Sequence, residues 1–390
     1  MDREQRFPIG ASVTIEVLTN SPYEALTQLR VSEPVSWVPA TSAWFVTRRD
    51  LAIEAMFDAD RFTVADDRFT TAQVLGTSML NLDGREHERH RRAFVQPFRP
   101  RFVREELEGR ISATATRLLS SALDGSADLR SGLAGPLAVE TILDVLGLDD
   151  LATSEVLGWY GAFGEAITAL TVGDEVPSTV HGTLSQLYAY VEGAMEADDA
   201  GFISQLVSDQ VLTDEEIPAA VAVVMFGAIE TSEAMTSNAL WHLFTNPATL
   251  DRVRADRSLL PRVIDESLRL EPAAAWVDRY TTTDVELGDT SIPAGDLVTI
   301  NLLAANRDPH VFDSPDVFDI DRPNPAQHVT WAQGPHTCLG LHVAKAETAA
   351  AITAVLDAED LRNYRFELDF DQSVAPTGLI FRKPTAVVVQ

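Results

Sequence analysis

The sequence predicts a mainly α-helical fold with small peripheral β-sheets. Two observations lead to this prediction. Residues from about 100 to 270 form long stretches rich in Ala, Leu and Glu, which favour helix, whereas short runs of aromatic and β-branched residues, which favour strand, lie toward the two ends of the chain. No fixed-period repeat, low-complexity tract or long Gly/Ser/Pro-rich linker interrupts the chain. We therefore expect residues 1–390 to form a single domain.

Strand character appears in three places. Residues 43–47 are aromatic and β-branched, and residues 284–300 have strand character with a turn signal at 293–295. From Tyr364 onward the tail alternates apolar and polar residues, and it ends in a β-branched run at 385–389. These segments predict the peripheral sheets.

The longest expected helix is also the most apolar. Thr213 and Glu216 form a capping-box pattern, and apolar residues dominate from there to about Phe244, a span of roughly 45 Å in a helix. Pro218 lies in the first turns and lacks a backbone donor, so the start of this helix is its least defined part. The apolar stretch at 217–229 is shorter than the ~20 residues that a bilayer requires, which predicts a buried core helix.

Composition excludes several classes of function. The formal net charge of −29 predicts repulsion from phosphate backbones and anionic membranes, so we expect no nucleic-acid partner. Cys338 is the single cysteine, which excludes an intrachain disulfide and a cysteine-rich zinc cluster and fits a reducing compartment. The first residues contain no apolar segment typical of a signal peptide or membrane anchor. These features predict a cytoplasmic protein without a membrane anchor.

Cys338 has three interpretations. A lone cysteine is most often a buried structural residue. It can also be a catalytic nucleophile, for which His336 is a candidate base. The third interpretation is an iron ligand, because Gly334 and Gly340 permit close approach of a flat cofactor, and a helix expected just after Cys338 would stabilise a thiolate through its dipole. Spacing alone leaves all three open.

A basic segment contrasts with the acidic chain. Between Arg85 and Arg104 there are seven arginines and only two acidic residues. One interpretation is a solvated run of charges. The other is an anion-binding site, since guanidinium groups bind carboxylates well, and His87 and Arg91 share one helix face.

An acid and an alcohol lie inside the long apolar helix, at Glu230 and Thr231. Burying such groups is costly unless they have partners. Either Thr231 donates to the carbonyl of Gly227 while Glu230 faces solvent, or the disturbed backbone leaves a groove for O₂ and water beside a functional pair.

The loop around Cys338 resembles the haem-binding loop of the cytochrome P450 family, with Trp331, Gly334, Cys338 and Gly340 at the family's spacing. The resemblance implies that Cys338 is the thiolate ligand of haem b (iron protoporphyrin IX). Trp331 replaces the usual Phe and Ala332 replaces a common Gly, which affects the surroundings of the sulfur rather than the ligand itself.

Further segments match the family in its order along the chain. The resemblance implies four contacts to the haem propionates, at His87, Arg91, Arg279 and His336. It also implies a structural lock without chemistry, formed by Glu266, Arg269 and Arg322. The oxygen-activating acid–alcohol pair of the family falls on Glu230 and Thr231, which would deliver protons. Ala228 replaces a frequent Gly beside this pair.

The activity that this resemblance implies is monooxygenation, with one atom of O₂ inserted into an apolar or amphipathic small molecule such as a natural-product intermediate. Electrons would come from a separate ferredoxin and ferredoxin reductase. By the same resemblance, residues 64–80, about 155–185, 273–277 and 378–380 line the substrate pocket. The individual pocket candidates are Phe226, Gly227, Ala228, Ala275, Trp276 and Leu379.

The sequence leaves three alternative functions open. An enzyme of the same fold can use peroxide directly, or catalyse desaturation or dehydration. A haem sensor or electron carrier is an alternative from another class. A hydrolase with Cys338 as nucleophile and no haem is the third, and it predicts a colourless protein.

Overall fold

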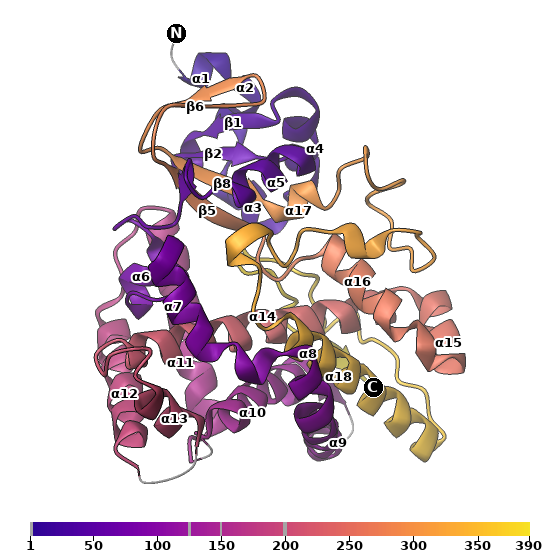
Figure 1. The fold of residues 1–390 in the computed structure, drawn as a ribbon. Coiled ribbons are helices and arrows are strands. Elements are labelled where there is room, and N and C mark those ends of the chain that lie inside the picture. Colours follow the sequence, from indigo (N-terminus) through magenta and orange to yellow (C-terminus); the bar gives the residue numbers. More distant parts are fainter. Residues whose placement is uncertain (1–2, 124–125, 149, 198–200) are drawn as a thin grey trace.

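The computed structural model describes residues 3–123, 126–148, 150–197 and 201–390, and it confirms a mainly helical fold with small sheets (Figure 1). The α-helices of the described residues are α1 (Arg3–Arg6), α2 (Pro8–Ser12), α3 (Ile15–Asn20), α4 (Tyr23–Ser32), α5 (Arg49–Phe57), α6 (Thr70–Leu75), α7 (Gly84–Phe94), α8 (Pro100–Phe102), α9 (Glu108–Ala122), α10 (Gly135–Leu146), α11 (Thr153–Thr171), α12 (Ser178–Met195), α13 (Phe202–Asp209), α14 (Ile217–Thr245), α15 (Pro247–Ala255), α16 (Leu260–Leu270), α17 (Leu302–Ala305) and α18 (Leu341–Arg362).

The described strands form three small sheets. They are β1 (Val35–Val38), β2 (Ala43–Val46), β3 (Phe62–Thr63), β4 (Ala127–Asp128), β5 (Trp276–Thr281), β6 (Val285–Leu287), β7 (Thr290–Ile292), β8 (Leu297–Asn301) and β9 (Val388–Val389). The largest sheet has the order β1-β2-β8-β5-β3, in which β2 and β8 run parallel and the other neighbours antiparallel. The other two sheets pair β4 with β9 and β6 with β7.

The strand predictions from sequence are confirmed in position. Residues 43–47 contain β2, and residues 284–300 contain β6, β7 and most of β8. The tail contributes the short strand β9 and isolated bridges such as Val374 with Ala386. The helices α1 to α6 of the first quarter were not predicted, because none is longer than ten residues and so short a helix gives little periodic signal.

The long apolar helix is α14, which crosses the helical body (Figure 1). Pro218 occupies its second position, where a missing N–H breaks no bond within the helix. The backbone N–H of Thr213 donates to the Glu216 carboxylate at 2.8 Å, which is one half of the expected capping box. The helix is long and apolar enough to span a membrane, but 78% of its most apolar window is buried inside the protein. We therefore assign α14 to the core.

Segments that are far apart in the sequence meet around the residues singled out above. The large sheet lies at the top of Figure 1 and the helical body lies below it, with α7 descending from the sheet side. β5 in the sheet, α7, α14 and the loop before α18 carry the residues singled out from the sequence. Four segments that are far apart in the sequence thus contribute residues to one part of the fold.

Candidate active site

The loop before α18 holds Cys338 in a defined backbone conformation. The N–H of Cys338 donates to the carbonyl of Trp331 at 2.8 Å. Gly334 has a φ of +75°, and a Cβ atom there would lie 2.6 Å from the carbonyl oxygen of Met56, so only glycine fits. Ala332, which replaces a common glycine of the resembling family, also has a positive φ of +56°. An alanine in this conformation is strained, which shows why glycine is favoured there.

The Cys338 thiol is open to solvent yet surrounded by protein. Its side chain is exposed, while desolvation by the nearby protein raises the pKa of the thiol. Hydrogen bonds from the N–H groups of Gly340 and Leu341, at the start of α18, and the charge of Arg91 act in the opposite direction and favour the thiolate. His336, the candidate base of the hydrolase interpretation, bonds instead to Asp83, with Nε2 2.8 Å from the carboxylate oxygen.

The four predicted propionate contacts come from three elements. His87 and Arg91 lie on α7, Arg279 on β5 and His336 in the turn before Cys338. The rings of His87 and His336 lie 4.3 Å apart between centroids. Arg91 donates from Nη2 to the carbonyl of Thr337 at 2.7 Å. The α7 pair is therefore adjacent to the residues that flank the cysteine.

Two of these side chains have buried donors without partners. Among the described residues, His87 Nε2 and Arg279 Nη2 are buried and form no hydrogen bond. Desolvation lowers the pKa of His87 to about 4 and that of Arg279 to about 10, and the nearby carboxylate of Asp83 offsets only part of this effect. Arg279 otherwise donates from Nη1 to the carbonyl of Asp278 at 2.7 Å.

The residues present fit haem b. A buried polar donor without a partner costs free energy, and the two propionates of haem are anionic acceptors of the kind that His87 Nε2 and Arg279 Nη2 lack. The exposed sulfur of Cys338, with backbone donors that favour its thiolate, suits an iron ligand. His87 and Arg279 thus offer hydrogen-bond donors for the propionates, and Cys338 offers a thiolate for the iron.

The acid–alcohol pair of α14 combines parts of both interpretations from sequence. Thr231 Oγ1 donates to the carbonyl of Gly227 at 2.5 Å, as expected from a back-bonded threonine. Glu230, however, does not face solvent: it is 7% exposed, and burial raises the pKa of its carboxyl group. Gly227 is exposed, and Ala228 and Thr231 are half-buried, so one stripe of this otherwise buried helix is open.

The predicted lock residues lie together in the core. Arg269 donates from Nε and Nη2 to the two carboxylate oxygens of Glu266, each at 2.8 Å, and both side chains are fully buried. Arg322 Nε lies 3.2 Å from both oxygens of Glu266. Both arginines also donate to the carbonyl of Val317, which ties the loop before Cys338 to α16.

The pocket candidates divide into two groups. Gly227 is exposed and Ala228 is half-buried. The other four are nearly closed to solvent and packed in the core, namely Phe226, Ala275, Trp276 and Leu379. The ring of Trp276 packs against Phe45 of β2, with centroids 5.7 Å apart. Among these candidates, the accessible ones are therefore the two small residues of α14, Gly227 and Ala228.

Sequence reasoning missed two partners of the predicted residues. Lys383, near the end of the chain, lies 2.8 Å from a carboxylate oxygen of Glu230. Asp83, at the start of α7, binds His336 and also accepts from the Thr63 hydroxyl at 2.6 Å. Neither had a signal in the sequence, because both contacts join residues more than 150 positions apart.

The chain is similar to known proteins in three respects: it matches a family model, it has related sequences, and its fold resembles a solved structure. Residues 176–385 match the family model described as Cytochrome P450. The chain is 29% identical to pulcherriminic acid synthase of Bacillus subtilis (strain 168) over 97% of each protein. It is 30% identical to cyclomarin C epoxidase CymV of Salinispora arenicola (strain CNS-205), over 85% of this chain and 87% of that protein. Its structure is similar to that of a mutant of P450 EryK in complex with erythromycin B, with a TM-score of 0.83, 26% identity, and coverage of 94% of this chain and 95% of that one.

Proposed function

Because this chain belongs to the cytochrome P450 family of haem b monooxygenases, we propose that it inserts one atom of O₂ into an apolar or amphipathic natural-product intermediate. Haem bound through a cysteine thiolate supplies the oxygen chemistry that protein side chains lack. The single observation that carries the assignment of the site is the exposed Cys338 thiol at the start of α18, beside buried donors without partners on His87 and Arg279.

The chain's own residues bind and orient the cofactor. Cys338 is the iron ligand, with the N–H groups of Gly340 and Leu341 stabilising its negative charge. His87 and Arg279 bind the propionates, and Arg91 and His336 lie beside the cysteine loop at the same site. The roles of His87 and Arg279 follow from their donors without partners, and those of Arg91 and His336 from the match to the family's pattern.

The test of this assignment is an absorption spectrum of the purified protein, oxidised and then reduced under carbon monoxide. We expect a strongly red-shifted Soret band in the reduced complex, since the thiolate ligand changes the electronics of the haem. A protein that stays colourless after haem reconstitution would contradict the assignment and return Cys338 to the nucleophile hypothesis. Turnover with peroxide but none with a reductase would favour the peroxide-using alternative.

Glu230 and Thr231 are proposed to deliver protons during O₂ activation. Gly227 and Ala228 leave space beside Thr231, whose hydroxyl is already bound to the helix backbone and can exchange that bond for one to water. Burial of Glu230 raises the pKa of its carboxyl group, while the charge of Lys383 opposes that shift. A carboxyl group beside an alcohol can take up a proton and pass it on.

Replacing Thr231 with alanine tests this role. We expect product formed per electron pair to fall at least about tenfold and peroxide release to rise, since general acid–base steps contribute this much or more. Product and peroxide are measured against NAD(P)H consumed. Thr236→Ala is the matched control on the same helix, because Thr236 bonds to Thr348 at 3.0 Å, away from the open stripe. Unchanged coupling in Thr231→Ala would contradict the role.

Substrate class is inferred from the accessible surface and the named relatives. The open stripe of α14 presents Gly227, Ala228 and Thr231 but no charge, which favours an apolar ligand. The relatives include an epoxidase of cyclomarin C and a P450 bound to erythromycin B. We therefore propose a natural-product intermediate, and a screen of such compounds for a spin-state shift of the oxidised protein identifies candidates.

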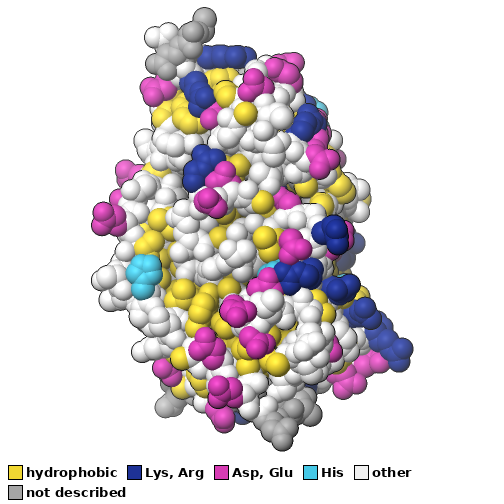
Figure 2. All heavy atoms as spheres, turned by 60° about the vertical axis from the view of Figure 1, so that its left-hand side comes forward, with side chains coloured by type: hydrophobic (Ala, Val, Ile, Leu, Met, Phe, Trp, Pro, Cys, Tyr) yellow, Lys and Arg dark blue, Asp and Glu magenta, His cyan; other side chains and the backbone are white. Residues whose placement is uncertain are grey.

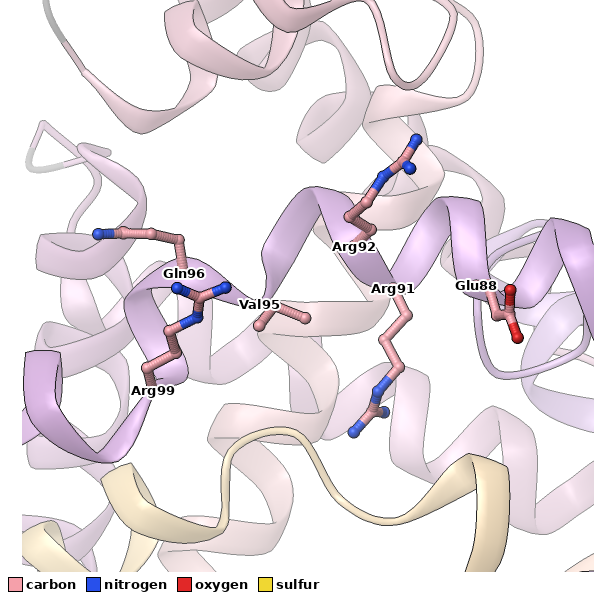
Figure 3. A pocket seen from close by; sticks show the side chains of 6 residues that line it. All are labelled: Glu88, Arg91, Arg92, Val95, Gln96 and Arg99. Atoms are coloured by element: carbon pink, nitrogen blue, oxygen red, sulfur yellow. The ribbon is translucent and has the colours of Figure 1, made fainter.

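The basic segment around α7 is proposed as the docking face for an acidic ferredoxin. A hollow of about 250 Å³ lies there, lined by Glu88, Arg91, Arg92, Val95, Gln96 and Arg99. In Figure 3 Arg91 points toward the segment whose Thr337 carbonyl it binds, whereas Arg92 points to the opposite side. Figure 2 shows basic side chains gathered along one edge of the face that includes this flank. This places positive charge close to the backbone beside Cys338.

Charge reversal tests the docking face. Arg92, Arg99 and Arg104 are exposed and form no ion pair with a described residue, whereas Arg101 pairs with Glu105 at 2.9 Å. The triple change of Arg92, Arg99 and Arg104 to Glu is expected to slow reduction by ferredoxin about tenfold or more at low salt, because electrostatic steering raises association rates by 10–10³-fold. The difference should shrink with ionic strength, as measured by stopped-flow reduction.

Arg362→Glu is the matched control for that experiment. Arg362 is exposed at the far end of α18, roughly 30 Å along the helix from its start near Cys338. Its reversal should leave the reduction rate unchanged. Equal slowing by Arg362→Glu, or rates that do not depend on salt, would place docking elsewhere.

We further propose that residues 1–390 act as one domain and that the protein is cytoplasmic. The single cysteine and the need for a ferredoxin partner support this location.

A further inference from the structure

A C-terminal hairpin lies along the acidic side of α14. Its two ends are joined by hydrogen bonds between Thr377 and Lys383, from each N–H to the other carbonyl at 3.1 Å. Phe381 packs edge-on against Phe226, with ring centroids 5.3 Å apart. The carbonyl of Arg382 accepts from Asn238 Nδ2 at 3.0 Å. Hairpin residues 377–383 therefore contact α14 at several points along its length.

Arg382 fixes this hairpin in the core. Its side chain is fully buried and donates from Nε to Glu271 at 2.6 Å. It also donates from Nη1 to the carbonyls of Thr19 and Gly378. The next residue, Lys383, is consequently held in a defined position and does not sample solvent freely.

Lys383 is the centre of a cluster of four charges. Its Nζ donates a hydrogen bond to Glu233 at 2.7 Å and lies 2.8 Å from Glu230 Oε1. Glu233 is also paired with Arg130, whose Nε lies 2.9 Å from its other oxygen. Both carboxylates are more than nine-tenths buried. Two acids and two bases thus compensate one another inside the protein, and Lys383 is the cation that contacts both acids.

We propose that Lys383 is a positioning residue for Glu230: it holds the carboxylate in its ionised form and sets the pH range over which Glu230 takes up and passes a proton. This inference rests on the proposed role of Glu230 in proton delivery. Lys383 Nζ lies within hydrogen-bond distance of both acids, at 2.7 Å from Glu233 and 2.8 Å from Glu230. Glu233 has a second ion pair, with Arg130, so Glu230 can turn away from Lys383 and leave the rest of the cluster paired.

The groups around Glu230 decide the direction of the effect. Desolvation raises the pKa of Glu230, Lys383 lowers it, Glu233 raises it and Arg130 lowers it. From α11, Gly164 faces this carboxyl group, and a Cβ there would lie 3.7 Å from its carboxyl carbon, so that element adds no charge at this point. Without Lys383, two buried acids would share one guanidinium, and the pKa of Glu230 would rise further.

That shift predicts how stability depends on pH. An acid whose pKa is higher in the folded than in the unfolded protein binds more protons when folded, so stability falls as pH rises between the two values. Lys383→Met should therefore lower the thermal midpoint of the purified enzyme by several degrees more at about pH 8 than at about pH 5.5. Lys383→Arg keeps the charge and should retain most of the wild-type profile.

Two further variants make the comparison specific. Lys345 and Lys383 are the only lysines of the sequence, and Lys345 pairs with Asp265 at 2.6 Å, so Lys345→Met is the matched control. Its midpoint should show no comparable pH dependence. Lys383→Met/Glu230→Gln removes both charges of the pair and should recover the lost stability at about pH 8. If Lys383→Met does not fold, a folded double variant still supports the proposal.

The catalytic readout is the pH profile of coupling. Product per electron pair in Lys383→Met should fall by up to about tenfold for each unit by which the pKa of Glu230 is displaced, and Lys383→Arg should restore it. A loss of stability that is independent of pH, or that Glu230→Gln does not relieve, would overturn the proposal. The red-shifted carbon monoxide band and turnover of the unmodified enzyme test the proposed function separately from these outcomes.

Discussion

Replacement of Cys338 by serine is expected to abolish the red-shifted Soret band of the reduced carbon monoxide complex. Serine is close in size, but its hydroxyl has a far higher pKa than a thiol, so the N–H groups of Gly340 and Leu341 cannot stabilise an anion there. Cys338 is the only cysteine, so no other thiolate can take its place. Monooxygenase activity should fall about a thousandfold or more, as loss of the central chemistry of an enzyme requires.

The control for this substitution is a change in the same loop that spares the sulfur. Thr337 donates its hydroxyl to the Gly334 carbonyl at 2.8 Å, so Thr337→Ala perturbs the loop without removing a ligand. It should retain the red-shifted band. An unchanged band in Cys338→Ser would remove Cys338 as ligand, and loss of the band in both variants would mean that loop conformation, rather than the thiolate, governs the spectrum.

The sequence predicted the helical fold and the short-range parts of the site. Cys338 and the start of α18 were found because a glycine-flanked loop and an apolar helix are local patterns. The Glu266–Arg269 spacing was visible for the same reason. Element boundaries were less accurate at α14, whose first residue is Ile217 with Pro218 in the second position. The short helices α1 to α6 gave no usable signal.

Long-range contacts could not be read from the sequence. Lys383 meets Glu230 only because Arg382 anchors the C-terminal hairpin against α14. The burial of Glu230 was likewise outside local reasoning, since an acid in an apolar helix has the same spacing whether it faces solvent or core. The ring of Trp276 is buried because it packs against Phe45, which lies on a strand more than 200 residues earlier in the sequence. Periodicity shows which face of an element is apolar, but not which partner covers it.

Replacement of Arg269 by leucine is expected to prevent assembly of a stable enzyme. Arg269 and Glu266 are fully buried, and the guanidinium also donates to the carbonyls of Asn306 and Pro315 at 3.0 and 2.6 Å. Leucine fills part of the volume but leaves these carbonyls without that donor. Glu266 would keep the N–H of Asp319 and, among the described residues, one paired cation, Arg322. Breaking a buried pair in this way costs about 3–5 kcal/mol, against a typical total stability of about 5–15 kcal/mol.

The loop that Arg269 fixes leads to Cys338, so the damage should extend to the cofactor. We expect Arg269→Leu to unfold at a much lower temperature and to bind little haem, measured by thermal denaturation and by the ratio of haem to protein. Arg252→Leu removes an arginine that pairs with Asp321 at 2.8 Å on the surface, and it should change neither quantity appreciably. Arg269→Leu with a near-normal midpoint and haem content would contradict the structural role, because a buried guanidinium with five acceptors cannot be lost without cost.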